Sequence, residues 1–136
     1  MIQRIQTIWF LLASACAFLS LKMPFYIGTN KNHIASYQLN GMENIFITII
    51  TCVVGALAFV TIFLFKKRRR QVRLSFLGIL VELVLLVLYY LEIKTFTEGT
   101  FALTALLQSC VILFYLLALR GIHKDINLVR SSDRLR

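Results

Sequence analysis

Four apolar blocks separated by polar connections dominate the pattern of hydrophobic and polar positions in this chain. They cover residues 5–26, 45–65, 74–91 and 101–119. The second block has 21 residues without a charge, and as a helix it would span about 31 Å, close to the hydrocarbon thickness of a bilayer. The pattern predicts an all-α fold, an integral membrane four-helix bundle that forms a single domain over residues 1–136.

The first block is interpreted as a retained helix and not as a cleaved signal. Its apolar run continues well past Cys16, where a lipoprotein-like cleavage site would end it. The polar segment that follows, residues 22–44, is rich in Asn and Gly, which favour turns. We expect it to be an extracytoplasmic loop with at most a short extended element, built from residues that include Tyr26, Ile27, Ile34 and Tyr37.

Two further polar segments define the second half of the chain. Residues 92–100 form a short connection, which predicts that the third and fourth helices are antiparallel neighbours. The basic tail, residues 120–136, carries Ile122, Ile126 and Val129 at helical spacing. This spacing predicts a cytoplasmic amphipathic helix that lies along the membrane surface.

The charge distribution predicts the orientation of the bundle. The chain has 15 Lys and Arg against 6 Asp and Glu, a net charge of +9. Twelve of the basic residues lie near the N-terminus, in the second connection and in the tail, and three lie in the other two connections. Basic residues are retained on the cytoplasmic side, so both termini are expected there, and a dual topology is not expected.

The basic segment between the second and third blocks and the two termini are candidates for docking a partner. The alternative is that they serve as a topology anchor and a solvated collar in contact with anionic lipids. Nucleic acid is not an expected partner, because no stacking aromatic residues are interleaved with the charges. The candidate residues are Arg4, Lys66, Lys67, Arg68, Arg69, Arg70, Arg73, Arg120, Lys124, Asp125, Arg130, Asp133 and Arg134.

Glu82 is the one ionisable side chain expected in the membrane interior, about nine residues from either end of its block. Intramembrane acids are costly and often functional. Two interpretations remain open. A neutral Glu82 can hydrogen bond to Gln108 or Ser109 of the antiparallel fourth helix and hold the two helices together. Alternatively, its carboxyl can carry a proton or pair with a cationic substrate during transport.

No arrangement of residues typical of catalysis is present. His33 and His123 lie outside the predicted spans, which excludes a bis-His haem within the bundle. There is no metal-ligand spacing, phosphate loop or Ser-His-Asp pattern. The three cysteines, Cys16, Cys52 and Cys110, lie in apolar runs and are interpreted as packing residues. We therefore expect no enzymatic activity, no cofactor and no metal.

Three stretches near the ends of the chain carry a family resemblance: residues 1–7 (MIQRIQT), 120–125 (RGIHKD) and 128–136 (LVRSSDRLR). They resemble a family of small four-helix bacterial membrane proteins catalogued only as a domain of unknown function. The resemblance spans the whole chain and implies a bacterial inner membrane setting and an intact N-terminus. Because the family has no assigned activity, it implies no site residue; a basic residue is expected in its members at the position of His123.

Together these features predict a small multi-pass inner membrane protein that is an accessory or scaffold subunit of a membrane complex. Its expected partners are other membrane subunits or further copies of itself. The alternative is a small proton-coupled transporter that uses Glu82. It resembles the small multidrug exporters in outline, but its membrane acid lies in the third span and not in the first.

Overall fold

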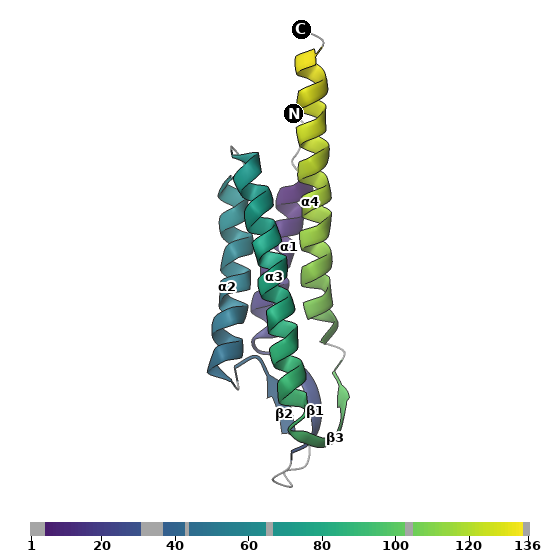
Figure 1. Ribbon diagram of the computed structural model, residues 1–136. Coiled ribbons are helices and arrows are strands. Elements are labelled where there is room, and N and C mark those ends of the chain that lie inside the picture. The colour runs from purple at the N-terminus through teal and green to yellow at the C-terminus, as the bar shows by residue number, and fades with distance from the viewer. Residues whose placement is uncertain (1–4, 31–36, 43, 65–66, 103–104, 135–136) are drawn as a thin grey trace.

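Four helices run side by side in the computed structural model, which describes residues 5–30, 37–42, 44–64, 67–102 and 105–134. They are α1 (Ile5–Ser20), α2 (Ile45–Phe63), α3 (Arg68–Ile93) and α4 (Ala105–Arg134). A small β-sheet lies at one end of the helices, and both termini lie at the other end (Figure 1). The predicted helical fold is confirmed, with the sheet as an addition.

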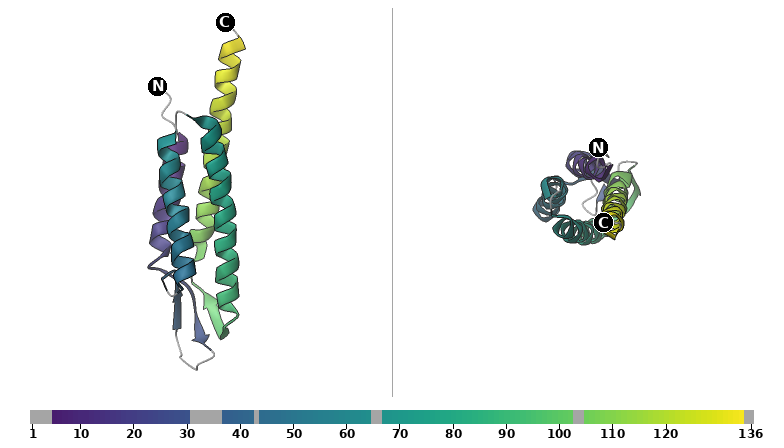
Figure 2. Two further views of the ribbon diagram at one scale, coloured as in Figure 1. Left: turned by 60° about the vertical axis from the view of Figure 1, so that its left-hand side comes forward. Right: turned by 90° about the horizontal axis from the view of Figure 1, so that it is seen from above.

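The helices form a closed ring. Each packs against two neighbours, in the order α1, α2, α3, α4 and back to α1. Seen along the axis, the four helices surround a common centre (Figure 2). Because consecutive helices run in opposite directions, the turn between α2 and α3 lies at the same end as the two termini (Figure 1).

The sheet joins two connections that are far apart in the sequence. Strand β1 (Pro24–Asn30) lies between β2 (Tyr37–Asn40) and β3 (Phe96–Phe101), and both pairings are antiparallel. Gly28 and Gly99 face each other across the β1–β3 pair. A Cβ on Gly28 would lie 2.8 Å from the Cα of Gly99, so the two strands can approach this closely only without side chains there.

The sheet corrects the expected limits of two helices. The first block, predicted over residues 5–26, is helical only as far as Ser20. Strand β1 begins at Pro24, which cannot donate the backbone hydrogen bond that a continuing helix needs. The fourth block, predicted over residues 101–119, begins its helix at Ala105 because Phe101 belongs to β3. At both places, residues that local hydrophobicity would assign to a helix form strands that pair with each other.

Helix α2 begins at a capped residue. The side chain of Asn44 accepts a hydrogen bond from the backbone N–H of Phe46 at 3.0 Å, which satisfies one of the free donors at the helix start. The same side chain donates to a carboxylate oxygen of Glu92, near the end of α3. This contact ties the beginning of α2 to the end of α3, beside the sheet.

The tail forms the last part of α4 and not a separate surface helix. Helix α4 runs without interruption to Arg134 and rises past the ends of the other helices (Figure 1). Ile122 is fully buried and Ile126 packs against the bundle core, whereas Val129 is 45% exposed. The helical prediction for the tail is confirmed, but the helix continues the axis of α4 and does not turn aside.

The outer surface of the helices is apolar, whereas several polar side chains are buried inside. Large hydrophobic residues such as Leu80, Leu83, Leu113 and Phe59 are about half exposed. Helices α2, α3 and α4 are long and apolar enough to cross a membrane, and α1 is a shorter apolar helix of 16 residues. An exposed apolar surface of this extent fits a membrane protein.

Candidate functional site

Helix α3 turns a largely polar face to the centre of the bundle. Its buried residues recur every three or four positions, the spacing of a helix face that packs against neighbours on both sides. Half of them carry polar side chains, although the lipid-facing residues of the same helix are leucine, valine and phenylalanine. The buried residues are Gln71, Ser75, Gly78, Glu82, Leu85 and Tyr89.

Glu82 lies in the middle of this face with an exposure of 0%, and neither carboxylate oxygen has a hydrogen-bond partner. Tyr89 and Tyr115 are close enough to interact with it electrostatically. The hydroxyl of Tyr115 donates instead to the backbone oxygen of Val54, at 3.0 Å. An unpartnered buried polar group costs about 1–3 kcal/mol, so the position of Glu82 calls for an explanation other than stability.

The contact between Gly78 and Tyr115 sets the register of α3 against α4. A Cβ on Gly78 would lie 2.6 Å from the ring of Tyr115, so the ring packs directly on the glycine. Helices α3 and α4 are antiparallel, so seven residues after Gly78 on α3 is level with seven residues before Tyr115 on α4. Gln108 therefore lies level with Leu85. Gln108 is therefore about 4.5 Å from Glu82 along the helix axis.

The predicted hydrogen bond from Glu82 to the fourth helix is not formed. Gln108 is buried at 1% exposure, and neither its amide nitrogen nor its amide oxygen has a hydrogen-bond partner. The hydroxyl of Tyr89 lies near Gln108 without completing a bond to it. Ser109 is exposed on the outer side of α4 and faces away from the interior. The helix rotation that buries Gln108 carries its neighbour outward.

Gln71 is a buried polar residue that the sequence analysis did not select. It lies within the basic segment at the start of α3 but is only 1% exposed. Its amide nitrogen donates to the backbone oxygen of Thr61 at 3.3 Å, and its amide oxygen has no partner. Its spacing of four residues from Ser75 and seven from Gly78 is the signal that would have placed it on the inner face.

We call Gln71, Glu82 and Gln108 the interior polar column. Gln71 lies near the end of the termini, Glu82 at the middle of α3 and Gln108 in the first turn of α4, near the sheet. Each has at least one buried polar atom without a hydrogen-bond partner. Along α3 the column extends about 21 Å, from Gln71 to the level of Gln108, which is close in depth to Glu82. It therefore offers free donors and acceptors at two depths.

The basic segment is mostly exposed at the end of the bundle that carries the termini. Lys67, Arg69, Arg70 and Arg73 are exposed, as are Arg120 and Lys124 on α4. Arg68 is the exception because it is partly buried. Arg4 and Lys66 lie outside the described residues, and so do the side chains of Arg130, Asp133 and Arg134.

Contacts between helices close the bundle at this end. The Nη1 of Arg68, at the start of α3, donates to the backbone oxygen of Asp125 on α4 at 3.1 Å. Gln6, in the first turn of α1, is buried against Gly121 of α4, where an added Cβ would lie 3.3 Å from the Cβ of Gln6. These contacts join α1, α3 and α4 at the end of the bundle that carries the termini.

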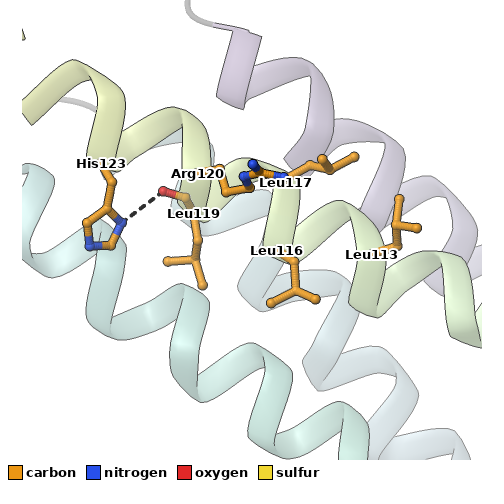
Figure 3. A pocket seen from close by; sticks show the side chains of 6 residues that line it. All are labelled: Leu113, Leu116, Leu117, Leu119, Arg120 and His123. Atoms are coloured by element: carbon orange, nitrogen blue, oxygen red, sulfur yellow. Dashed lines mark hydrogen bonds between the residues drawn. The ribbon is translucent and has the colours of Figure 1, made fainter.

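A groove of about 520 Å³ runs along the outer side of α4. We call it the α4 groove. Two adjacent rows of side chains line it, each with residues three or four positions apart, and each row ends in a basic or imidazole side chain. The rows are Leu113, Leu117 and Arg120, and Leu116, Leu119 and His123 (Figure 3).

The cysteines and the metal-binding residue types form no site within the part of the chain that the structure describes. Cys16, Cys52 and Cys110 are partly buried free thiols. No group of three or more His, Cys, Asp or Glu side chains among the described residues converges on a position that could hold a metal ion. The remaining candidate functional sites are the interior polar column and the α4 groove.

Comparison with known proteins identifies a family but no known activity. No curated protein and no solved structure matches the chain. The resemblance of the two termini to a family without an assigned role is confirmed, because the model described as "Domain of unknown function (DUF4293)" matches residues 2–135 and the chain belongs to this family.

Proposed function

We propose that this small multi-pass membrane protein is an accessory or scaffold subunit of a larger membrane assembly. The observation that carries the proposal is the free end of α4. Leu128 and Val129 are 48% and 45% exposed, on a helix that rises past the ends of its neighbours (Figure 1). Exposed apolar residues on a helix outside the apolar spans are typical of a protein contact surface.

The proposal includes a bacterial inner membrane location with both termini in the cytoplasm. Its support is the distribution of charge, with twelve of 15 Lys and Arg in the two termini and in residues 66–73, which link α2 to α3 and form the first turns of α3. These segments meet at one end of the bundle (Figure 1). Basic residues at a cytoplasmic face also attract the anionic lipids of that leaflet.

A double substitution on α4 tests the scaffold proposal. Leu128→Ser with Val129→Ser removes the apolar contact but leaves the transmembrane part unchanged. Asn127→Ser, at an exposed polar position of the same helix, is the control. We expect mild-detergent purification and mass spectrometry to recover one stoichiometric companion with the wild type and the control, and to lose it with the double variant. A clean homodimer without a companion would contradict the proposal.

A second candidate function, proton-coupled transport, is favoured by a different observation. Glu82 is fully buried near the middle of α3, and both of its oxygens are free of hydrogen bonds. Gln108 lies close in depth to Glu82, and Gln71 offers a further unpartnered polar atom toward the end of the bundle that carries the termini. A carboxyl without a structural partner in this environment is suited to bind and release a proton.

Glu82→Gln separates the two functions because it preserves shape and polarity but cannot ionise. In proteoliposomes with an internal pH dye, a transporter loses proton flux on this substitution at normal protein levels. A scaffold retains its companion and shows no flux in either form. Leu83→Gln, on the exposed face one residue away, is the matched control for adding an amide to α3.

A further inference from the structure

The α4 groove lies on the outer surface of the bundle, where its leucines face the hydrocarbon of a bilayer. Leu113 and Leu116 are 51% and 49% exposed, and Arg120 and His123 are exposed at one end of the groove. Its volume of about 520 Å³ lies within the range of about 300–1,000 Å³ that is usual for small-molecule sites. The groove is thus apolar along its length and cationic at one end.

The length of the groove matches one leaflet of a bilayer. From Leu113 to His123 the helix advances ten residues, or about 15 Å. This is half of the hydrocarbon thickness of about 30 Å. A single acyl chain that runs from the middle of the bilayer to its surface would therefore follow the groove from its apolar end to its basic end.

The basic end of the groove lies level with the beginning of two other helices. Gly121, next to Arg120, packs against Gln6 in the first turn of α1. Asp125, two residues after His123, accepts the hydrogen bond from Arg68 at the start of α3. Arg120 and His123 are therefore at the depth where the apolar part of the bundle ends and lipid headgroups begin.

The side chains at this end are suited to a phosphate. A guanidinium forms paired hydrogen bonds to phosphate oxygens. The Nδ1 of His123 lies 3.0 Å from the backbone oxygen of Leu119 (Figure 3). A carbonyl only accepts, so Nδ1 carries the proton. A phosphate oxygen is also an acceptor, so Nε2 can bind it only as the second N–H donor of the imidazolium form.

The lining argues against a transmembrane helix as the occupant. Helices that pack together in membranes favour small residues at the contact. The α4 groove has leucines at every apolar position and no small residue among its lining. We propose that the α4 groove binds one anionic phospholipid, with an acyl chain along the leucine rows and the phosphate against Arg120 and His123. This proposal is independent of the scaffold and transport functions.

Native mass spectrometry of the full chain in mild detergent tests this proposal, with phosphatidylglycerol and phosphatidylcholine added separately. We expect one phosphatidylglycerol to remain bound in preference to phosphatidylcholine. Arg120→Gln should weaken this binding by roughly fivefold, the factor that corresponds to one basic residue near an anionic lipid. Lys94→Gln removes the same charge at the opposite end of the bundle, directly after α3, farther away than the screening length, and should change the binding less than about twofold.

A second variant tests whether an acyl chain lies along the leucine rows of the α4 groove, and it leaves the charge of the protein unchanged. Leu116→Trp places a larger side chain in the groove on the exposed side of α4, so the bundle should remain folded by circular dichroism. We expect it to lose the bound phosphatidylglycerol. Equal binding by Arg120→Gln and Lys94→Gln, or undiminished binding by Leu116→Trp, would overturn the proposal.

Discussion

Two regions that join the helices differ in whether their buried polar groups have hydrogen-bond partners. At the sheet end, Tyr26, Leu39, Ile47, Leu85 and Tyr89 form an apolar cluster, which we call the sheet-end cluster. The sheet beside it pairs its backbone groups in two antiparallel ladders. The interior polar column, in contrast, buries Gln71, Glu82 and Gln108 with unpartnered atoms.

The difference indicates a division between a stable region and a functional one. Phe25 stacks on Tyr89 with ring centroids 4.2 Å apart, and Tyr26 makes edge contacts with Phe96 and Phe101. Such contacts stabilise one arrangement. Polar atoms without partners do the opposite, because they lower stability and leave donors and acceptors free. The division is not complete, because the side-chain oxygen of Asn40 at the sheet end is also unpartnered, and Gln108 lies near Tyr89 of the sheet-end cluster.

The largest effect is expected from a truncation in the sheet-end cluster. Tyr89→Ala should lower the free energy of unfolding by about 3–5 kcal/mol, the usual cost of deleting a buried aromatic ring. Its neighbour supplies a matched control, since Tyr90 is 60% exposed whereas Tyr89 is 1% exposed. Tyr90→Ala should cost about 0.5 kcal/mol or less. Unfolding of both variants in mixed micelles measures the difference, and equal losses would remove the distinction between the two regions.

The contact between α3 and α4 should be the next most sensitive. Gly78→Ala places a Cβ 2.6 Å from the ring of Tyr115, so we expect overpacking to cost about 1–3 kcal/mol. Adding Tyr115→Leu removes the ring and should reduce the cost of the alanine. If the cost of Gly78→Ala is the same in both backgrounds, the ring is not the cause, and the register of α3 against α4 must be revised.

Removal of polar atoms from the interior polar column should raise the free energy of unfolding, whereas the two preceding substitutions should lower it. Glu82→Leu removes two unpartnered oxygens and should raise the free energy of unfolding by about 1–3 kcal/mol. Glu82→Gln retains polar atoms and should have a smaller effect. The same unfolding assay decides the matter, because a loss of stability in Glu82→Leu would mean that Glu82 has a hydrogen-bonding role that stabilises the bundle.

The smallest effect is expected at the start of α2, beside the sheet. Asn44→Ala removes the side-chain acceptor for the N–H of Phe46 and should cost about 1 kcal/mol. Asn44→Ser retains an oxygen that can cap the helix and should recover most of this loss. A comparison of thermal unfolding midpoints will show the difference, and similar midpoints for the alanine and serine variants would indicate that the cap does not stabilise α2.

The interior of the bundle was predicted in its components but not in its contacts. The isolated acid in an apolar block directs attention to Glu82, and both Glu82 and Gln108 are buried. The sequence does not reveal that these two side chains fail to pair, because this depends on the separation and rotation of two helices. Ser109 was placed with Gln108 although the helix rotation turns it outward, and Gln71 was missed because arginines surround it.

Hydrophobic length and charge along the sequence determine that four helices form and that an even number of them brings both termini to one end. These features are local, and each apolar run long enough to span a bilayer specifies its own helix. Only the tertiary structure decides the sheet, because β1 and β3 belong to connections separated by α2 and α3. Their pairing becomes favourable once the bundle has brought their ends together, since the loop-closure entropy is then already lost. The same assembly decides which polar atoms have partners and brings the basic ends of α3 and α4 together.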